Sequence, residues 1–365
     1  MNFNAPLLRP IRILFFPFSL IYGLIIWIRN KLFDKGYISS SEFNLPVIGV
    51  GNLSVGGTGK SPMVECLIDL LSKKYEVAVL SRGYKRKTKG YALATTGITA
   101  LEIGDEPMQF FNKFPGVTIA VGEERLEAIP QLLHDKPGTQ LIILDDAFQH
   151  RSVRAGINIV LTDYNNLFTR DWFLPTGDLR DNVSSYKRAD ILVVTKCPAD
   201  LSETERDSIA KEINPLPHQR LFFTSINYGS AYHIISRHER PINDKDEVLL
   251  VSGIANPDPL KKYLSDNADT YYEILYEDHR IFSIDDWKEI RKRFESISSE
   301  NKIILTTEKD AVRLMKFQQS IESYPFYVLP MQVHFLFGGE QLFTYLIINF
   351  IAGFINKNEN NQVLQ

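Results

Sequence analysis

The sequence has little cysteine and no excess of charge of either sign. Two of its 365 residues are cysteine, Cys66 and Cys197, which are too few for a disulfide framework and favour a reducing compartment. Lys plus Arg number 41 and Asp plus Glu 44, so the formal charge of −3 gives no overall basic field, and we expect no nucleic-acid partner. Hydrophobic residues make up 44% and charged residues 23%, which excludes a disordered chain and a polytopic membrane protein.

An apolar stretch without charges occupies residues 13–28, with basic residues on both sides. As a helix it would be about 24 Å long, which is short for a bilayer core that needs ~20 residues. Pro17 and Gly23 interrupt it, and no small-residue cleavage site follows. Three interpretations stay open: a helix in the membrane surface, a short signal anchor, and a helix buried in the protein. The basic flanks and the aromatic residues favour a membrane-associated helix.

Short runs rich in Val and Ile alternate with helical patterns after residue 45. This order predicts an α/β fold with a mostly parallel sheet and helices on both faces. The expected strands are residues 47–50, 77–80, 117–121, 141–144, 157–161, 191–195 and 221–224. The expected helices are residues 62–73, 106–114, 125–134 and 203–213.

A second, smaller α/β unit is predicted after a polar segment at residues 227–246, which we interpret as an interdomain connection. Its expected strands are 248–251, 271–275, 302–305 and 326–329, and its expected helices are 257–265, 284–297 and 309–317. The predicted organisation is an N-terminal membrane-associated helix at 1–36, a nucleotide-binding core domain at 37–226, the smaller domain at 247–350 and a polar tail at 351–365.

A glycine-rich loop follows the first expected strand and opens the first expected helix, in the sequence VIGVGNLSVGGTGKSP at residues 47–62. It departs from the strict P-loop pattern only where Ser54 replaces the first glycine. Glycines let backbone N–H groups point at phosphates, Lys60 would reach the β- and γ-phosphates, and the Ser61 hydroxyl would bind Mg²⁺. The loop therefore predicts a P-loop NTPase-type nucleotide site for ATP or GTP, formed by Ser54, Val55, Gly56, Gly57, Thr58, Gly59, Lys60 and Ser61.

Two aspartates, Asp145 and Asp146, end the apolar strand LIILDD. A carboxylate at this position of a P-loop protein meets Mg²⁺ at the carboxyl end of the sheet, although aspartate pairs also begin ordinary loops. A basic segment at residues 81–90 follows the second expected strand. It begins at the same edge of the sheet as the phosphate loop, where ligands of α/β proteins bind. Its arginines suit an anionic acceptor, and Arg125 could join them, although a solvated loop and a solvated helix start are the alternatives.

Other polar residues are candidates for the reaction itself. Asp105 in GDEP begins a helix, where an acidic residue also serves as an ordinary cap. His279 in EDHRIF lies in the predicted smaller domain, and a carboxylate paired with a histidine could accept the proton of an attacking hydroxyl across an interdomain cleft. Gln149 and His150 follow the aspartate pair, and Asp181 ends the turn LPTGDLRD.

Taken together, these motifs resemble the tetraacyldisaccharide 4′-kinase family, the lipid A 4′-kinases of Gram-negative bacteria. The resemblance rests on GNLSVGGTGKSP, SRGY, GDEP, LDDAFQH, LPTGDLR, SGIANP, EDHRIF and TTEKDAVRL, in this order between residues 51 and 314. It implies transfer of a phosphoryl group from ATP to the 4′-hydroxyl of a tetraacylated glucosamine disaccharide 1-phosphate, giving lipid IVA. It also implies a peripheral or monotopic inner-membrane protein with its active site on the cytoplasmic side, and no obligate protein partner is inferred.

The resemblance also implies roles for single residues. Asp105 would be the catalytic base and His279 its partner, while Asp145 and Asp146 would act in catalysis and hold Mg²⁺-ATP with Ser61. Asp181 stands where the family usually has Glu, and as a shorter carboxylate it is still predicted as a metal ligand. The predicted acceptor-binding residues are Arg82, Tyr84, Arg86, Arg125, Gln149 and His150.

Other classes of protein share part of this pattern. A membrane-associated ATPase or GTPase that switches a protein partner would also need the phosphate loop and the aspartate pair. It would not need the basic segment at residues 81–90 or the Asp105 and His279 motifs. A small-molecule P-loop kinase or ligase with its first helix packed on the core is a second alternative, and the intact phosphate loop disfavours a nonenzymatic scaffold.

Overall fold

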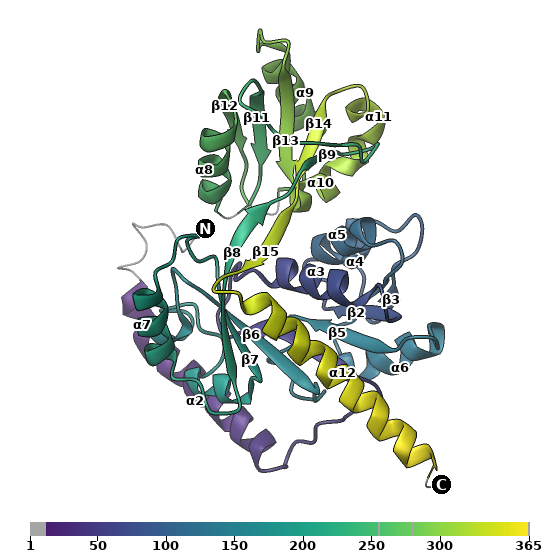
Figure 1. Cartoon of the computed structure of the whole chain (residues 1–365), viewed down its shortest axis with the longest axis vertical. Coiled ribbons are helices and arrows are strands. Elements are labelled where there is room, and N and C mark those ends of the chain that lie inside the picture. Colours follow the sequence, from purple (N-terminus) through teal and green to yellow (C-terminus); the bar gives the residue numbers. More distant parts are fainter. Residues whose placement is uncertain (1–11, 255, 279, 364–365) are drawn as a thin grey trace.

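A computed structural model describes residues 12–254, 256–278 and 280–363, and it arranges the chain around two sheets (Figure 1). The larger sheet has the strand order β15-β8-β7-β6-β1-β5-β2-β4-β3. Seven neighbouring strands from β8 to β4 are parallel, whereas β15 and β3 run antiparallel at the two edges. The strands are β1 (Val47–Asn52), β2 (Val77–Ser81), β3 (Ala92–Leu93), β4 (Thr118–Val121), β5 (Leu141–Asp145), β6 (Ile157–Asp163), β7 (Ile191–Thr195), β8 (Arg220–Tyr228) and β15 (Met331–Phe335).

Helices cover both faces of the larger sheet, which confirms the predicted fold class. On one face α3 (Lys60–Leu71), α5 (Asp105–Lys113) and α12 (Gly339–Val363) bury apolar side chains against the strands. On the other face α6 (Arg125–Asp135), α7 (Glu203–Ile213) and the 3₁₀ turn η3 (Val183–Arg188) do the same. The short helices α4 (Ala100–Ile103) and η2 (Phe168–Arg170) lie in loops. Because β1, β2, β5 and β7 are buried along their whole length, their sequences show continuous apolar runs.

The smaller sheet has the order β10-β9-β14-β13-β11-β12. Its strands are β9 (Ala231–His233), β10 (Glu239–Arg240), β11 (Glu247–Ser252), β12 (Thr270–Leu275), β13 (Lys302–Thr307) and β14 (Phe326–Leu329). The helices of this unit are α8 (Asp258–Asn267), α9 (Ile284–Glu295), α10 (Glu308–Leu314), η4 (Met315–Phe317) and α11 (Gln318–Ile321). Four strands are parallel, so the predicted second α/β unit is present.

The structure corrects three boundaries expected from the sequence. Residues 227–246 are not only a connection, because they supply β9 and β10 to the smaller sheet. Residues 331–350 return to the larger unit, where β15 pairs with β8 and α12 buries Phe343 and Ile347 in the main core. The same helix continues to Val363, through most of the predicted tail. Short edge strands with alternating polar residues give a weak signal in sequence, and this explains the error.

Two chain crossings join the units, one between β8 and β9 and one between β14 and β15 (Figure 1). The two crossings lie side by side, since the Gly229 N–H donates to the Pro330 carbonyl at 3.1 Å. Farther out, α5 of the larger unit faces α10 of the smaller one, where Arg313 forms an ion pair with Asp105. The units therefore meet next to a predicted catalytic residue.

The N-terminal helix presents its apolar side chains outward. It consists of η1 (Ile13–Phe15) and α2 (Phe16–Asp34), and Pro17 lies in the first turn, where it does not interrupt the helix. The residues that α2 buries are small or polar, namely Ser19, Gly23 and Asn30. Its exposed large side chains are Phe16, Phe18, Leu20, Ile21, Leu24, Ile25, Trp27, Ile28 and Leu32. By length and composition the helix could cross a membrane, and its outward apolar face contradicts a helix buried in the protein.

Candidate active site

The phosphate loop joins β1 to α3 and is held from three sides. Gly56 and Gly59 adopt positive φ angles of 102° and 81°, which glycine reaches without strain. The Val55 N–H donates to the Asp178 carbonyl at 2.7 Å, and the Thr195 hydroxyl donates to the Thr58 carbonyl at 2.9 Å. Asn52 donates to the Thr58 hydroxyl at 2.8 Å. The loop is thus fixed where α3 begins, at a helix start whose free N–H groups favour phosphate.

Asp145 and Asp146 stand in different electrostatic settings beside this loop. Asp145 is buried, and burial with the nearby charges of Glu106 and Asp146 raises its pKa. For Asp146, burial would raise the pKa, but the cations of Lys60 and Arg180 outweigh it and lower the pKa to about 2. The Lys60 Nζ lies 3.7 Å from Asp146 Oδ1, and the Arg180 guanidinium contacts both oxygens of the same carboxylate. Asp146 is therefore ionised next to the P-loop lysine.

These residues fit a magnesium ion. The Ser81 hydroxyl donates to Asp145 Oδ2 at 2.9 Å, whereas Oδ1 is buried and has no hydrogen-bond partner among the described residues. This orphaned oxygen and the carboxylate of the neighbouring Asp146 are hard donors of the kind that Mg²⁺ prefers, and Ser61 stands in the first turn of α3, next to Lys60. Within the described residues no group of three His, Cys, Asp or Glu side chains is arranged as a metal site. A cation here would complete its coordination with phosphate oxygens and water.

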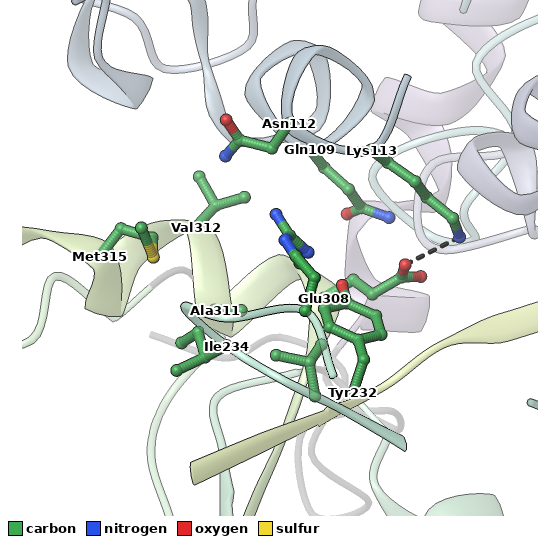
Figure 2. Close-up of a pocket in the computed structure, with 11 residues that line it drawn as sticks. Gln109, Asn112, Lys113, Tyr232, Ile234, Glu308, Ala311, Val312 and Met315 are labelled. Carbon is green, nitrogen blue, oxygen red and sulfur yellow. Dashed lines mark ion pairs between the residues drawn. The ribbon is translucent and has the colours of Figure 1, made fainter. Parts of the chain in front are cut away.

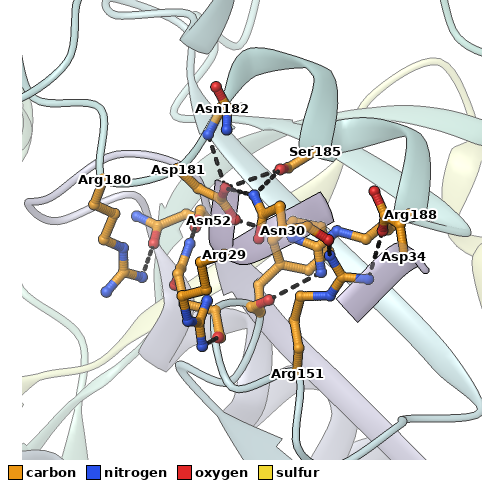
Figure 3. A network of polar contacts seen from close by, with 12 residues as sticks. Arg29, Asn30, Asp34, Asn52, Arg151, Arg180, Asp181, Asn182, Ser185 and Arg188 are labelled. Atoms are coloured by element: carbon orange, nitrogen blue, oxygen red, sulfur yellow. Dashed lines mark hydrogen bonds and ion pairs between the residues drawn. The ribbon is translucent and has the colours of Figure 1, made fainter. Parts of the chain in front are cut away.

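Asp181, the third residue predicted as a metal ligand, is held by protein donors in this structure (Figure 3). The side chain is buried, and both its oxygens are occupied by the protein. Oδ1 accepts from Asn30 Nδ2 at 2.7 Å and from the Ser185 hydroxyl at 2.9 Å, and Oδ2 accepts from Arg188 Nη2 at 2.9 Å. The sequence pattern could not reveal this, because Asn30 belongs to the N-terminal helix.

Asp105 lies at the start of α5 and is bound by the smaller unit. Its Oδ2 accepts from Arg313 Nε at 2.9 Å and from Nη2 at 2.8 Å. His279 lies outside the described residues, so the pairing of Asp105 with His279 stays a prediction. The neighbouring Asp278 contacts Lys309 of α10 at 3.6 Å. The contact of Asp105 with Arg313 was not predicted from the sequence, although Arg313 belongs to the TTEKDAVRL motif.

The predicted acceptor residues divide into two groups. Arg82 and Tyr84 are exposed on the basic segment at residues 81–90, where they can meet a ligand. Arg86 instead has a side chain that is only 2% exposed, and it forms an ion pair at 2.7 Å with the half-buried Glu123. Arg125 is fully buried, and its guanidinium donates to the Gly122 and Asp145 carbonyls. This placement favours a role for Arg86 and Arg125 in holding the loops rather than in touching an acceptor.

Gln149 and His150 follow the aspartate pair closely in the chain. Gln149 Nε2 donates to the Asn52 carbonyl at 2.7 Å, and its Oε1 is buried without a partner among the described residues. Burial and the cations of Arg125 and Arg82 lower the pKa of His150 to about 4, so the ring is neutral at pH 7. A neutral imidazole and a free amide oxygen can both hydrogen-bond to a sugar hydroxyl.

Comparison with known proteins decides the family. The family model described as Tetraacyldisaccharide-1-P 4'-kinase matches residues 11–351. The chain belongs to this family. It is similar to a tetraacyldisaccharide 4'-kinase of Bacteroides thetaiotaomicron, at 44% identity over 95% of this chain and 94% of that protein. A relative of the same description from Flavobacterium johnsoniae is 44% identical over 93% of this chain and 97% of its own length.

A solved structure supports the same conclusion. LpxK from Aquifex aeolicus, in complex with ATP, is 30% identical to this chain, with a TM-score of 0.73. The match covers 93% of this chain and 99% of that one. The predicted family, the α/β fold and the enzyme class are thereby confirmed, and the protein is a kinase.

The kinase also contains a buried ion cluster between its two units, and Figure 2 shows the Lys113–Glu308 pair of this cluster. Lys113 at the end of α5 lies 2.7 Å from Glu65 of α3 and 2.7 Å from Glu308 of α10. Gln109 adds a hydrogen bond of 2.7 Å to Glu65. Burial and the charge of Glu308 raise the pKa of Glu65 above its ordinary value of 4.5. Burial alone would lower the pKa of Lys113, but the two carboxylates outweigh it and raise it above 10.5.

We expect Lys113→Met to lower the free energy of unfolding by about 3 kcal/mol at pH 8, because it leaves two buried carboxyl groups without their cation. The loss should be smaller at pH 5. Because its pKa is raised, Glu65 is protonated in the folded state at pH 5. The variant then no longer has to bury the negative charge of Glu65 without a cation. Denaturant unfolding at both pH values measures this, with the exposed Lys74→Met as control. A loss equal to that of the control at pH 8 would contradict the assignment.

Proposed function

We propose that this kinase transfers the γ-phosphoryl group of ATP to the 4′-hydroxyl of a tetraacyldisaccharide 1-phosphate, giving lipid IVA. The observation that carries the proposal is the meeting of the phosphate loop, Lys60 and the Asp145–Asp146 pair at one sheet edge in a chain of this family. The segment at residues 81–90 begins at the same edge of the sheet, and its exposed cations suit an acceptor that bears a phosphate. A switch ATPase or GTPase would not need them.

The phosphate loop and Lys60 would hold the triphosphate of ATP, with the start of α3 supplying N–H groups and the positive end of its dipole. Ser61, Asp145 and Asp146 would hold Mg²⁺, which would neutralise charge on the β- and γ-phosphates. Arg180 keeps Asp146 ionised and directed at Lys60. Phosphoryl transfer depends mainly on such positioning and charge, so these fixed contacts are the protein's main contribution.

Asp105 would accept the proton of the attacking hydroxyl. Its ion pair with Arg313 places a cation beside the carboxylate, and a carboxylate in its ionised form can accept a proton. Because Arg313 comes from α10, the pair would also bring the smaller unit close to a bound acceptor. His279 is the further predicted partner of this carboxylate, and Arg82, Tyr84, Gln149 and His150 would contact the sugar and phosphate groups.

The apolar face of α2 would lie in the cytoplasmic surface of the inner membrane, where the lipid acceptor is found. Trp172 extends this face, since it is exposed and packs edge-on against Phe16 with ring centroids 5.4 Å apart. Aromatic side chains beside basic flanks suit the interface between lipid and water. A peripheral or monotopic attachment fits a helix whose polar face is held by the protein.

We expect charges on this face to release the protein from membranes. Replacing Ile21, Leu24 and Ile25 together by Glu places three carboxylates on exposed positions, so most of the protein should move to the soluble fraction. Fractionation of cell lysates at moderate salt measures the shift. A triple variant with Leu, Ile and Leu at these positions keeps the face apolar and should stay with the membrane. Retention of the Glu variant would exclude this face as the attachment site.

The function itself is tested with the purified full chain, labelled ATP and tetraacyldisaccharide 1-phosphate in mixed detergent micelles. Transfer of label to the lipid is expected, and an acceptor that lacks the 4′-hydroxyl should receive none. Hydrolysis of ATP that does not depend on the acceptor, without any transfer, would instead support the ATPase or GTPase alternative.

A further inference from the structure

The polar inner face of α2 contacts the two residues that end the LPTGDLRD turn. The Tyr22 hydroxyl donates to the Arg180 carbonyl at 3.1 Å. Asn30 Nδ2 donates to Asp181 Oδ1 at 2.7 Å, and Figure 3 shows this second bond. Asn30 is 8% exposed and Asp181 is 1% exposed, so water does not compete for the second bond. The helix that carries the apolar outer face therefore touches the active-site segment directly.

The Asp181 carboxylate accepts hydrogen bonds from four donors. Besides Asn30, its carboxylate accepts from the Ser185 hydroxyl, from the Asn182 N–H at 2.8 Å and from Arg188. Figure 3 shows these groups converging on Asp181. A buried carboxylate with both oxygens occupied holds its own backbone rigidly, and with it the preceding residue.

Arg180 is held in the same way on its main chain. Its N–H donates to the Leu53 carbonyl at 2.8 Å, and its carbonyl accepts from Tyr22. The side chain of Arg180 then reaches the active site, where it contacts Asp146 and the Asn52 side chain. Asn52 in turn supports Thr58 of the phosphate loop. Arg180 alone thus links the N-terminal helix to Asp146, and Arg180 with Asn52 links the helix to the phosphate loop.

We propose that Tyr22 and Asn30 are positioning residues for phosphoryl transfer, because they fix Arg180 and Asp181 and so hold the Arg180 guanidinium on Asp146 and Asn52. The inference rests on the proposed function and adds a second role to α2, beyond attachment to a membrane. A contact that only anchors the helix would affect access to the lipid. A contact that positions Arg180 affects the rate with both substrates bound, because small displacements of reacting groups are costly.

The test measures kcat and KM of the full chain in mixed micelles, with saturating ATP and lipid. We expect Asn30→Leu to lower kcat about 10-fold and Tyr22→Phe about 3-fold, with the KM for the lipid changed less than about 2-fold. Asn30→Gln keeps an amide donor and should recover part of the loss. Variants with wild-type kcat, or a loss confined to the KM for the lipid, would overturn the proposal.

The matched control is Asp34→Asn on the same helix. It removes the ion pair of Asp34 with Arg151 at 2.7 Å but leaves Arg180 and Asp181 untouched, so kcat should stay within about 2-fold of wild type. If Asn30→Leu fails to fold, the kcat of Tyr22→Phe still tests the positioning role. This variant removes a single oxygen atom, so it should fold like the wild type. A wild-type protein without acceptor-dependent transfer would refute the proposed function, whereas active wild type with fully active variants would refute only the positioning role.

Discussion

A Lys60→Ala protein is expected to have a kcat about 10³-fold lower than that of the wild type. Lys60 is the cation of the phosphate loop, and its Nζ lies 3.7 Å from the ionised Asp146. The substitution removes a positive charge from the place where negative charge develops on the transferred group. It also leaves Asp146 with Arg180 as its main cationic partner. Steady-state transfer of label from ATP to the lipid acceptor measures the loss.

Two controls separate this loss from a loss of folding. Lys60→Met keeps the length and the helix propensity of the side chain, so it should be as inactive as Lys60→Ala while its unfolding midpoint stays near that of wild type. Lys74→Ala removes an exposed cation shortly after the same helix and should keep full activity. Activity of Lys60→Ala within 10-fold of wild type would exclude the assigned role of the loop.

The local part of the site could be predicted from the sequence because each motif is continuous along the chain. The loop at residues 54–61 and the pair Asp145–Asp146 lie next to the strands that position them, so pattern and geometry agree. The strands of the parallel sheet were predictable for a similar reason, since burial on both faces leaves long apolar runs.

The contacts between distant segments could not be predicted in the same way. Arg180 reaches Asp146, Arg313 reaches Asp105, and Asn30 reaches Asp181, and none of these pairs is close in sequence. Chemical type alone was misleading in two cases. Asp181 has the chemistry of a metal ligand but accepts from four protein donors, and Arg125 has the charge to bind an anionic acceptor but is buried against backbone carbonyls.

The return of the chain to the larger sheet was missed because its signals are weak when taken singly. Met331, Val333 and Phe335 alternate with polar residues, which is typical of an edge strand, and the strand is only five residues long. In α12, Phe343, Ile347 and Ile351 repeat every four residues, and this spacing matches one face of a helix. The two signals together would have placed the segment on the main core.

Asp105→Asn is expected to lower kcat about 10²-fold, because an amide cannot accept the proton of the sugar hydroxyl. The substitution keeps the size of the side chain and leaves one oxygen able to accept from Arg313, so the interface between α5 and α10 should persist. The KM for ATP should therefore change little. The measurement is kcat and KM for both substrates, with the unfolding midpoint as a check on the interface.

Two further variants distinguish a base from an interdomain contact. Glu102→Gln changes an exposed acid that caps the neighbouring helix α4, so it should alter stability slightly and leave kcat intact. Asp105→Glu keeps a carboxylate and should retain more activity than Asp105→Asn if proton transfer is the function of this residue. If Asp105→Asn has full activity, the ion pair with Arg313 is structural and another group must accept the proton. Equal and large losses in both Asp105 variants, with a lowered unfolding midpoint, would assign the residue to the interface instead.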